Sequence, residues 1–240
     1  MNVAVFRPDD ERIAEAIDLL ESLGVVPIPD PMLEVAPTGE TPREDAEYAI
    51  FTSKTGVELV SEAGWTSGEA TVCAIGEGTA SALREHGYAV DLIPEEFSSA
   101  GLVETLADRV PGRRVEVARS DHGSPVLTDG LEAAGAYVHE TVLYRLTRPA
   151  GSGQSAALAA SGDLAAALFT SSLTVEHFLD AAADRGMREA ALAGLNDAVV
   201  GVIGTPTAET ARAHGIEVDV VPDRADFETL ARATVDRLDG

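Results

Sequence analysis

The chain of 240 residues contains one lysine, one cysteine and one tryptophan. Its 17 basic residues are outnumbered by 41 aspartates and glutamates, which gives a formal net charge of −24 at pH 7. Nucleic-acid binding depends on clustered Lys and Arg side chains that neutralise phosphates, so this composition excludes a nucleic-acid partner. The single cysteine, Cys73, cannot form an intrachain disulfide, which fits a reducing compartment.

Long apolar runs are also missing. No stretch approaches the roughly 18 apolar residues that a membrane span needs. The first ten residues contain no basic segment followed by an apolar one, so we expect no signal peptide. With 45% hydrophobic residues, the chain can still build a sizeable core. We therefore expect a soluble, cytoplasmic, monomeric protein with no membrane partner.

The scarcity of lysine is informative because it occurs together with 41 acidic residues. A dense acidic surface keeps a protein hydrated in molar salt, where the Debye length falls to about 3 Å and the repulsion between carboxylates is screened. We therefore interpret the composition as that of a protein from a halophilic source.

The chain is internally duplicated. Phe51-Thr52-Ser53 recurs 118 residues later as Phe169-Thr170-Ser171. Matching segments in the same order indicate two copies of one pattern, roughly residues 1–110 and 113–238. Further pairs, at offsets of 128 and 112 residues, are Ile75-Gly76 with Ile203-Gly204, Thr79-Ala80 with Thr207-Ala208, and Val3-x-Val5-x-Arg7 with Val115-x-Val117-x-Arg119.

Each copy alternates short apolar strands with amphipathic helices, a pattern typical of a parallel sheet with crossover helices. The sequence therefore predicts an α/β fold of two similar, doubly wound parallel-sheet domains. The predicted strands are 2–6, 48–52, 71–75, 89–93, 114–118, 166–170, 199–203 and 218–221, and the predicted helices include 13–23, 79–85, 102–110, 175–185 and 227–238.

Two extended, proline-containing segments, 25–37 and 136–149, occupy equivalent places in the two copies. We expect strands within them, at about 27–37 and 138–148, to pair antiparallel and to link the domains. The alternative, one continuous domain per repeat, would leave each segment as a lone fifth strand. The linker instead predicts an inserted domain, 37–146, and a discontinuous domain, 1–36 with 147–240.

Ligand sites in doubly wound sheets lie beyond the carboxyl ends of the strands, where helix N-termini present unpaired backbone N–H groups. The repeated motifs fall at such ends. Ser and Thr cap helices there, and the remaining amides bind anions. Capping alone is the alternative at any one position, whereas matched positions in two domains favour a shared anionic ligand. The predicted binding residues are Thr52, Ser53, Gly76, Thr79, Thr170, Ser171, Ser172, Gly204, Thr205 and Thr207.

Motifs for other chemistry are missing from the sequence. Lys54 follows Ser53 without the glycine of a Walker loop. Gly76-Glu77-Gly78 hints at a dinucleotide loop, but its counterpart Gly204-Thr205-Pro206 lacks the second glycine. No zinc-protease, Cys-x-x-Cys or serine-hydrolase motif occurs. We therefore expect no metal, no cofactor and no nucleophilic side chain.

Six segments have an order and spacing that resemble a known family along the full length of the chain: 51–57, 74–80, 97–102, 119–121 with Pro125, 142–145, and 203–208. The chain resembles the uroporphyrinogen-III synthase family of tetrapyrrole (haem and cobalamin) biosynthesis, and its acidic composition suggests a haloarchaeal type. The resemblance implies two α/β domains joined by a two-stranded ladder, with the active site in the cleft. It also implies a lyase that cyclises hydroxymethylbilane, a linear tetrapyrrole polycarboxylate, to uroporphyrinogen III, with inversion of ring D, loss of water and no cofactor.

The resemblance also implies roles for single residues. Tyr144 matches the family's tyrosine on the ladder strand and is the candidate general acid for the departing hydroxyl, with packing between domains as its alternative role. Arg7, Arg119 and Ser120 are expected to hold acetate and propionate groups of the substrate, although either arginine could form an ordinary strand-end ion pair. The chain departs from the family at Thr205-Pro206, where the loop has one amide fewer.

A protein of another class is the alternative function. Duplicated α/β proteins can close on a small anion without chemistry, as two-domain binding or sensor proteins do. Replacing Tyr144 by phenylalanine discriminates between the two, because only an enzyme has turnover to lose.

The halophilic interpretation predicts loss of structure when salt is removed, because repulsion among the 41 acidic side chains is then unscreened. Circular dichroism in molar salt and in dilute buffer measures this. An unchanged spectrum in dilute buffer would refute the interpretation.

Overall fold

The structure is a computed structural model that describes residues 1–8 and 11–238. The chain divides into two compact units. Unit 1 comprises Met1–Glu34 and Thr147–Gly240, and unit 2 comprises Val35–Leu146. The chain therefore passes between the units twice, and one unit is inserted into the other.

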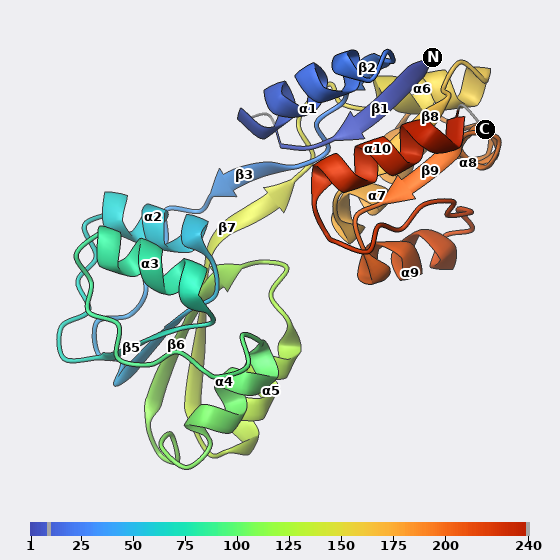
Figure 1. The fold of residues 1–240 in the computed structure, drawn as a ribbon. Helices are drawn as coiled ribbons and strands as arrows, with labels where there is room; N and C mark the ends of the chain where they lie inside the picture. The colour runs from blue at the N-terminus through green and yellow to red at the C-terminus, as the bar shows by residue number, and fades with distance from the viewer. Residues whose placement is uncertain (9–10, 239–240) are drawn as a thin grey trace. The chain divides into compact units, whose positions relative to one another are not determined.

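Unit 2 contains a five-stranded sheet (Figure 1). From β7 to β5 its neighbouring strands are parallel, as the alternation of strands and helices predicts. The strand order is β3 (Glu34–Pro37), β7 (Tyr137–Thr147), β6 (Arg114–Ser120), β4 (Tyr48–Phe51) and β5 (Thr71–Ala74).

Helices cover both faces of this sheet, because alternate residues of each strand point to opposite faces. In β4, Phe51 belongs to the core on one face and Ile50 to the core on the other, and both are fully buried. The first core includes residues of α2 (Lys54–Glu62) and α3 (Glu77–Glu85), and the second includes residues of α4 (Ser99–Leu106) and α5 (Pro125–Ala133).

Unit 1 is doubly wound in the same way. Phe6 and Phe169, on adjacent parallel strands, stack with ring centroids 4.5 Å apart in the core of one face, while Val5 and Leu168 are buried on the other. The strand order is β2 (Val26–Pro29), β1 (Asn2–Phe6), β8 (Ala166–Phe169) and β9 (Val199–Val202). One face carries α6 (Gln154–Ser161), α7 (Ser172–Asp184), α8 (Arg188–Asn196) and α9 (Thr205–Ala213), and the other carries α1 (Glu11–Ser22) and α10 (Phe227–Leu238). The predicted α/β class with parallel sheets is confirmed in both units.

The two sheets correspond strand by strand, since β2-β1-β8-β9 of unit 1 matches β7-β6-β4-β5 of unit 2. The correspondence extends to side chains. Asp91 Oδ2 accepts a 2.8 Å hydrogen bond from Val72 N, and Asp219 Oδ2 accepts one of the same length from Val200 N. The central pairs, β1 with β8 and β6 with β4, each join strands from different copies of the repeat. This strand order excludes one continuous domain per repeat.

Two predicted strands are wrong. Residues 89–93 and 218–221 each contribute a single bridge to the edge strands β5 and β9 within the described chain. The carboxylates of Asp91 and Asp219 accept the strand N–H group that a continued ladder would use. These segments are therefore irregular chain that makes one parallel bridge each and is held to the edge strand by a side chain.

The extended segment 25–37 is two strands rather than one. Between β2 and β3 the chain turns inward at Asp30-Pro31, and Asp30 is only 3% exposed. β3 then lies beside β7, and the two arrows run in opposite directions (Figure 1). The next residue, Thr38, extends the contact, because its N–H donates to Leu143 O at 3.0 Å and its hydroxyl to Val142 O at 2.7 Å.

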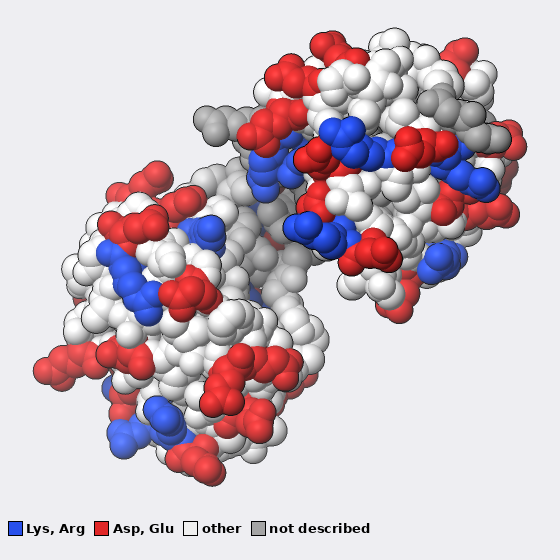
Figure 2. Space-filling view, in the orientation of Figure 1, with Lys and Arg blue, Asp and Glu red and all other residues white. Residues whose placement is uncertain are grey.

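The surface follows the composition. Figure 2 shows Asp and Glu side chains spread over the visible face of each unit, with fewer Lys and Arg between them. Within the described chain, no helix has both the length and the apolar character needed to cross a membrane.

A buried carboxylate joins the two segments of unit 1. Helix α6 begins after Gly153, whose φ of 103° suits glycine and which provides no side-chain cap. Asp30 supplies the cap from 123 residues away. Its carboxylate accepts hydrogen bonds from Gly153 N at 2.7 Å and Ser155 N at 2.9 Å, and a further one from the Ser155 hydroxyl. A negative charge at a helix N-terminus is favourable, so this contact stabilises both the helix and the discontinuous unit.

We predict that Asp30→Ala lowers the free energy of unfolding by about 1–3 kcal/mol, because it leaves buried N–H groups without an acceptor. Thermal unfolding at constant salt measures the change. Asp18→Ala on the exposed side of α1 removes the same charge and is the matched control. Equal stability of the two variants would contradict the capping role.

Candidate active site

In both units the predicted binding residues lie where parallel strands end and helices begin. In unit 2, β4 leads into α2 and β5 into α3, and in unit 1, β8 leads into α7 and β9 into α9. Each of these helices starts at the carboxyl edge of its own sheet. The first N–H groups of each helix, which have no partner inside the helix, therefore face this edge.

Ser53 and Tyr144 are brought together at the edge of unit 2. The Tyr144 hydroxyl donates a 3.0 Å hydrogen bond to Ser53 Oγ, which also accepts a 3.0 Å bond from Gly56 N as the N-cap of α2. A Cβ on Gly56 would lie only 3.1 Å from Ser53 Oγ and 3.2 Å from Leu143 Cδ1, so the close approach favours glycine. Ser53 therefore fixes the direction of the phenol, which belongs to a residue only 7% exposed. Thr52 is partly exposed beside them.

The start of α3 has no side-chain cap. Its N-cap, Gly76, has an extended backbone, so the N–H groups of Glu77 and Gly78 are available to an anion. Thr79 lies one position further and is only 6% exposed, so its hydroxyl lies inside the unit rather than at the open edge. Phe97 packs on Gly76, where a Cβ would lie 3.2 Å from Phe97 Cγ. Phe97 is nevertheless 63% exposed.

The single lysine lies beside this helix start. Lys54 opens α2, and a Cβ on Gly78 would lie 3.1 Å from Lys54 Cε and 3.9 Å from its Nζ. Its ammonium group thus adds positive charge where the dipole of α3 is already positive. Lys54 and Phe97 are not among the binding residues predicted from the sequence. The signals were present, because Lys54 is the only lysine and Phe97 opens the family-like segment 97–102.

Arg119 is held inside unit 2. Its Nη2 lies 2.6 Å from Glu140 Oε2, and its Nη1 donates to Ser124 O at 2.5 Å. The side chain is 6% exposed, and a Cβ on Gly123 would lie within 2.3–2.6 Å of its Cδ, Nε and Cζ atoms. The structure therefore favours the ion-pair alternative over the substrate contact expected for Arg119. Ser120, at the end of β6, is partly exposed.

Three hydroxyls gather at the corresponding edge of unit 1. Ser171 is the N-cap of α7 and forms a capping box with Thr174. The Thr170 hydroxyl donates to the last carbonyl of β1 at 2.9 Å, and the Ser172 hydroxyl donates to Pro206 O at 3.2 Å. Each hydroxyl thus has a structural partner, as the capping alternative requires, while all three residues are partly exposed.

Helix α9 repeats the uncapped start of α3. Gly204 is its N-cap with an extended backbone and no side-chain cap, and Pro206 removes one N–H group from the first turn. Thr205 is exposed, whereas Thr207 is 3% exposed and lies inside the unit, like Thr79 in unit 2.

Arg7 follows β1 at the same edge of unit 1. Its guanidinium carbon lies 4.7 Å from the centroid of the Phe227 ring, at the start of α10. This cation–π contact holds the guanidinium at the end of the strand.

Neither a metal cluster nor a reactive thiol lies at these edges in the described structure. No group of three or more His, Cys, Asp or Glu side chains among the described residues is placed to hold a metal ion. Cys73 in β5 is fully buried. Burial, followed by the negative charge of Asp91, raises the pKa of its thiol to about 12, so it is protonated at neutral pH.

The fold defines a class: α/β proteins with two parallel-sheet units, each with helix N-termini at the carboxyl edge of its own sheet. Comparison with known families identifies the family within this class. The family model described as Uroporphyrinogen-III synthase HemD matches residues 14–232. The chain belongs to the uroporphyrinogen-III synthase family, which confirms the resemblance read from the sequence.

Related proteins and solved structures agree with this family assignment. A protein of Methanothermobacter thermautotrophicus, provisionally named uroporphyrinogen-III synthase, is 34% identical over 247 residues and covers 96% of each chain. The uroporphyrinogen-III synthase of Synechococcus elongatus is 29% identical over 175 residues, or 66% of each chain. A crystal structure of a mutant Thermus thermophilus uroporphyrinogen III synthase has the same fold, with a TM-score of 0.68, 20% identity, and coverage of 99% of this chain and 98% of that one.

We predict that Cys73 reacts with a thiol reagent about a thousandfold more slowly in the native protein than after unfolding, since its pKa is about 12 rather than 9. Labelling with a disulfide reagent at pH 8, with and without denaturant, measures the two rates. Rapid, stoichiometric labelling of the native protein would show that the thiol is accessible and ionised.

Proposed function

We propose that this protein is a lyase that cyclises hydroxymethylbilane to uroporphyrinogen III, with inversion of ring D and loss of water, in tetrapyrrole biosynthesis. The observation that carries the proposal is the match of the family model over residues 14–232. The uncapped starts of α3 and α9 support it, because a linear tetrapyrrole carries acetate and propionate groups that such helix N-termini bind.

The substrate is intrinsically reactive. When the C–O bond of its hydroxymethyl group breaks, the electron pair leaves with oxygen, which takes up a proton and departs as water. The resulting azafulvenium cation is attacked by ring D. Attack through the free carbon of ring D, followed by loss of its proton, gives the type I isomer. Attack through the substituted carbon gives a spiro intermediate, in which the bond from that carbon to the methylene shared with ring C breaks. This methylene then bonds to the free carbon, which loses its proton to give type III. The protein's task is therefore to orient the chain and to place charge correctly.

Tyr144 is the proposed general acid. Its hydroxyl is directed by the 3.0 Å hydrogen bond to Ser53 Oγ, and that oxygen is itself fixed as the N-cap of α2. A phenol held in this way has a defined position, and it donates its proton to the departing hydroxyl by exchanging the hydrogen bond to Ser53 for one to the substrate. In the alternative role of Tyr144, as an aromatic residue that only packs, the hydroxyl would have no function.

The carboxylates of the substrate are proposed to bind at the edges of both units. In unit 2 the contacts are Thr52, Ser53, Ser120 and the N–H groups that follow Gly76, with Lys54 as an added cation and the exposed ring of Phe97 as a surface for a pyrrole. Arg119 supports this edge through its ion pair with Glu140. In unit 1 the contacts are Arg7, Thr170, Ser171, Ser172, Gly204 and Thr205.

The isomer of the product tests the function directly. Freshly prepared hydroxymethylbilane is incubated with the protein in high salt, and the oxidised products are separated by chromatography. We expect predominantly the type III isomer. Type I product alone, at the rate without protein, would show that the chain does not catalyse the reaction.

We predict that Tyr144→Phe lowers kcat by about 100-fold, since a positioned general acid contributes at least this much. Steady-state turnover at constant salt measures it. Tyr88→Phe is the matched control, because the Tyr88 hydroxyl also makes a hydrogen bond in unit 2, of 2.8 Å to Trp65 O. If both variants lose activity only in proportion to their stability, Tyr144 is a structural residue.

A further inference from the structure

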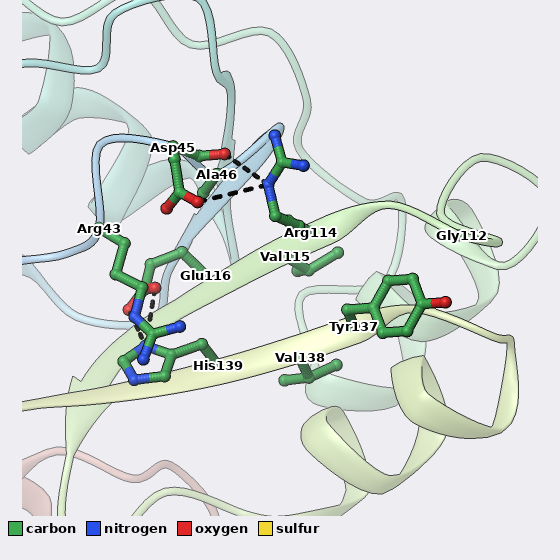
Figure 3. Close-up of a pocket in the computed structure, with 10 residues that line it drawn as sticks. All are labelled: Arg43, Asp45, Ala46, Gly112, Arg114, Val115, Glu116, Tyr137, Val138 and His139. Carbon is green, nitrogen blue, oxygen red and sulfur yellow. Dashed lines mark hydrogen bonds and ion pairs between the residues drawn. The ribbon is translucent and has the colours of Figure 1, made fainter.

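A second hollow, of about 400 Å³, lies at the other end of the unit 2 strands (Figure 3). Arg114 and Tyr137, the first residues of β6 and β7, line it together with the segment that precedes β4. The candidate active site lies at the carboxyl ends of the same strands, beyond Ser120. The mechanism proposed above therefore leaves this hollow unused.

The floor of the hollow contains a buried carboxylate. Glu116 is 1% exposed, and it lies opposite His139 in the register of β6 and β7. Glu116 Oε2 is 2.9 Å from His139 Nδ1, and Oε1 accepts a hydrogen bond from the Thr141 hydroxyl. This pairing satisfies the carboxylate and fixes the imidazole, whose Nε2 remains available for another partner.

Arg43 is an arginine of this hollow without a hydrogen-bonded or ion-paired partner in the described structure. Figure 3 shows its side chain reaching toward His139 and Glu116. Within residues 1–8 and 11–238, no hydrogen bond or ion pair is formed by Arg43. The other acid of the hollow, Asp45, has its own cation, because Arg114 Nε lies 3.6 Å from its carboxylate and 2.8 Å from its carbonyl oxygen. With Arg114 beside Asp45, and His139 and Thr141 beside Glu116, Arg43 is the guanidinium of this hollow that has no carboxylate partner among the described residues.

The neighbouring hollow provides a contrast. It shares Asp45 and Arg114 with the Arg43 hollow. Its other charged lining residues are Glu44, Glu47, Glu69 and Arg113. Four carboxylates therefore face two guanidinium groups there. The arginine without an ion pair therefore distinguishes the Arg43 hollow from this acidic neighbour.

Away from its charged end the hollow offers apolar surface from Ala46 and from the ring of Tyr137, which extends from the opposite end in Figure 3. Val115 and Val138 line it from the sheet, with their side chains in the core of the other face. The volume is in the range of sites for small molecules. We propose that this hollow binds a small organic monocarboxylate, with its carboxylate on Arg43 and its apolar body against Ala46 and the Tyr137 ring. The proposal rests on unit 2 alone and is independent of the cyclisation.

Calorimetric titration of the whole protein with benzoate, at constant high salt, tests the proposal. We expect saturable binding of one benzoate, with benzamide, the neutral analogue, binding at least tenfold more weakly. We expect Arg43→Gln to weaken benzoate binding about tenfold or more. Arg113→Gln, at the acidic neighbouring hollow, is the matched control and is expected to leave the affinity unchanged. Arg43 is exposed and unpaired, so its replacement leaves the fold intact.

NMR shows where on the protein benzoate binds, and this location is the second test of the proposal. We expect benzoate to shift the NMR resonances of His139 and Tyr137. No saturable binding, equal binding of benzamide, or equal loss in both arginine variants would overturn the proposal. Shifts confined to Tyr144 and its surroundings would overturn it as well, since the carboxylate would then occupy the candidate active site. Turnover of hydroxymethylbilane by Arg43→Gln at the wild-type rate is expected, and it separates this proposal from the function proposed above.

Discussion

The pairing of β1 with β8, and of β6 with β4, is the constraint on which the rest of the structure depends. Each central pair joins a strand from one copy of the repeat to a strand from the other. This exchange makes one unit discontinuous and brings residues from distant parts of the sequence to a common edge of each sheet. In unit 2 the same arrangement places the phenol of Tyr144 within reach of Ser53, 91 residues away in the sequence.

Much of the fold follows from local pattern. The bounds of β1 and α10 agree with the prediction to the residue, and the other predicted parallel strands agree to within two residues at either end. The errors arise where a side chain replaces a backbone partner. At Asp91 and Asp219 a carboxylate takes the place of the strand ladder and leaves a single bridge, and Asp30 breaks a long extended segment to cap a distant helix. Hydrophobic periodicity does not record such contacts, because they depend on tertiary structure.

The sequence predicted where the candidate site lies, but not which contacts its side chains make. Repeated Ser, Thr and Gly residues at strand ends marked the edges of both sheets. The sequence could not show that Thr79 and Thr207 point inward, or that Arg119 pairs with Glu140. What remains at the edges is largely backbone N–H groups, with few cations. Such groups bind carboxylates without adding basic residues, which suits a chain that has a dense acidic surface and a single lysine.

The insertion of unit 2 into unit 1 imposes an order on biosynthesis. Every residue of unit 2, up to Leu146, is synthesised before the first residue of β8. Until β8 has been made and has left the ribosome, β1 lacks this neighbour and exposes an apolar edge that is paired in the finished sheet. The first 34 residues thus await their partner while the whole of unit 2 is made, and this interval is when they are most open to wrong association.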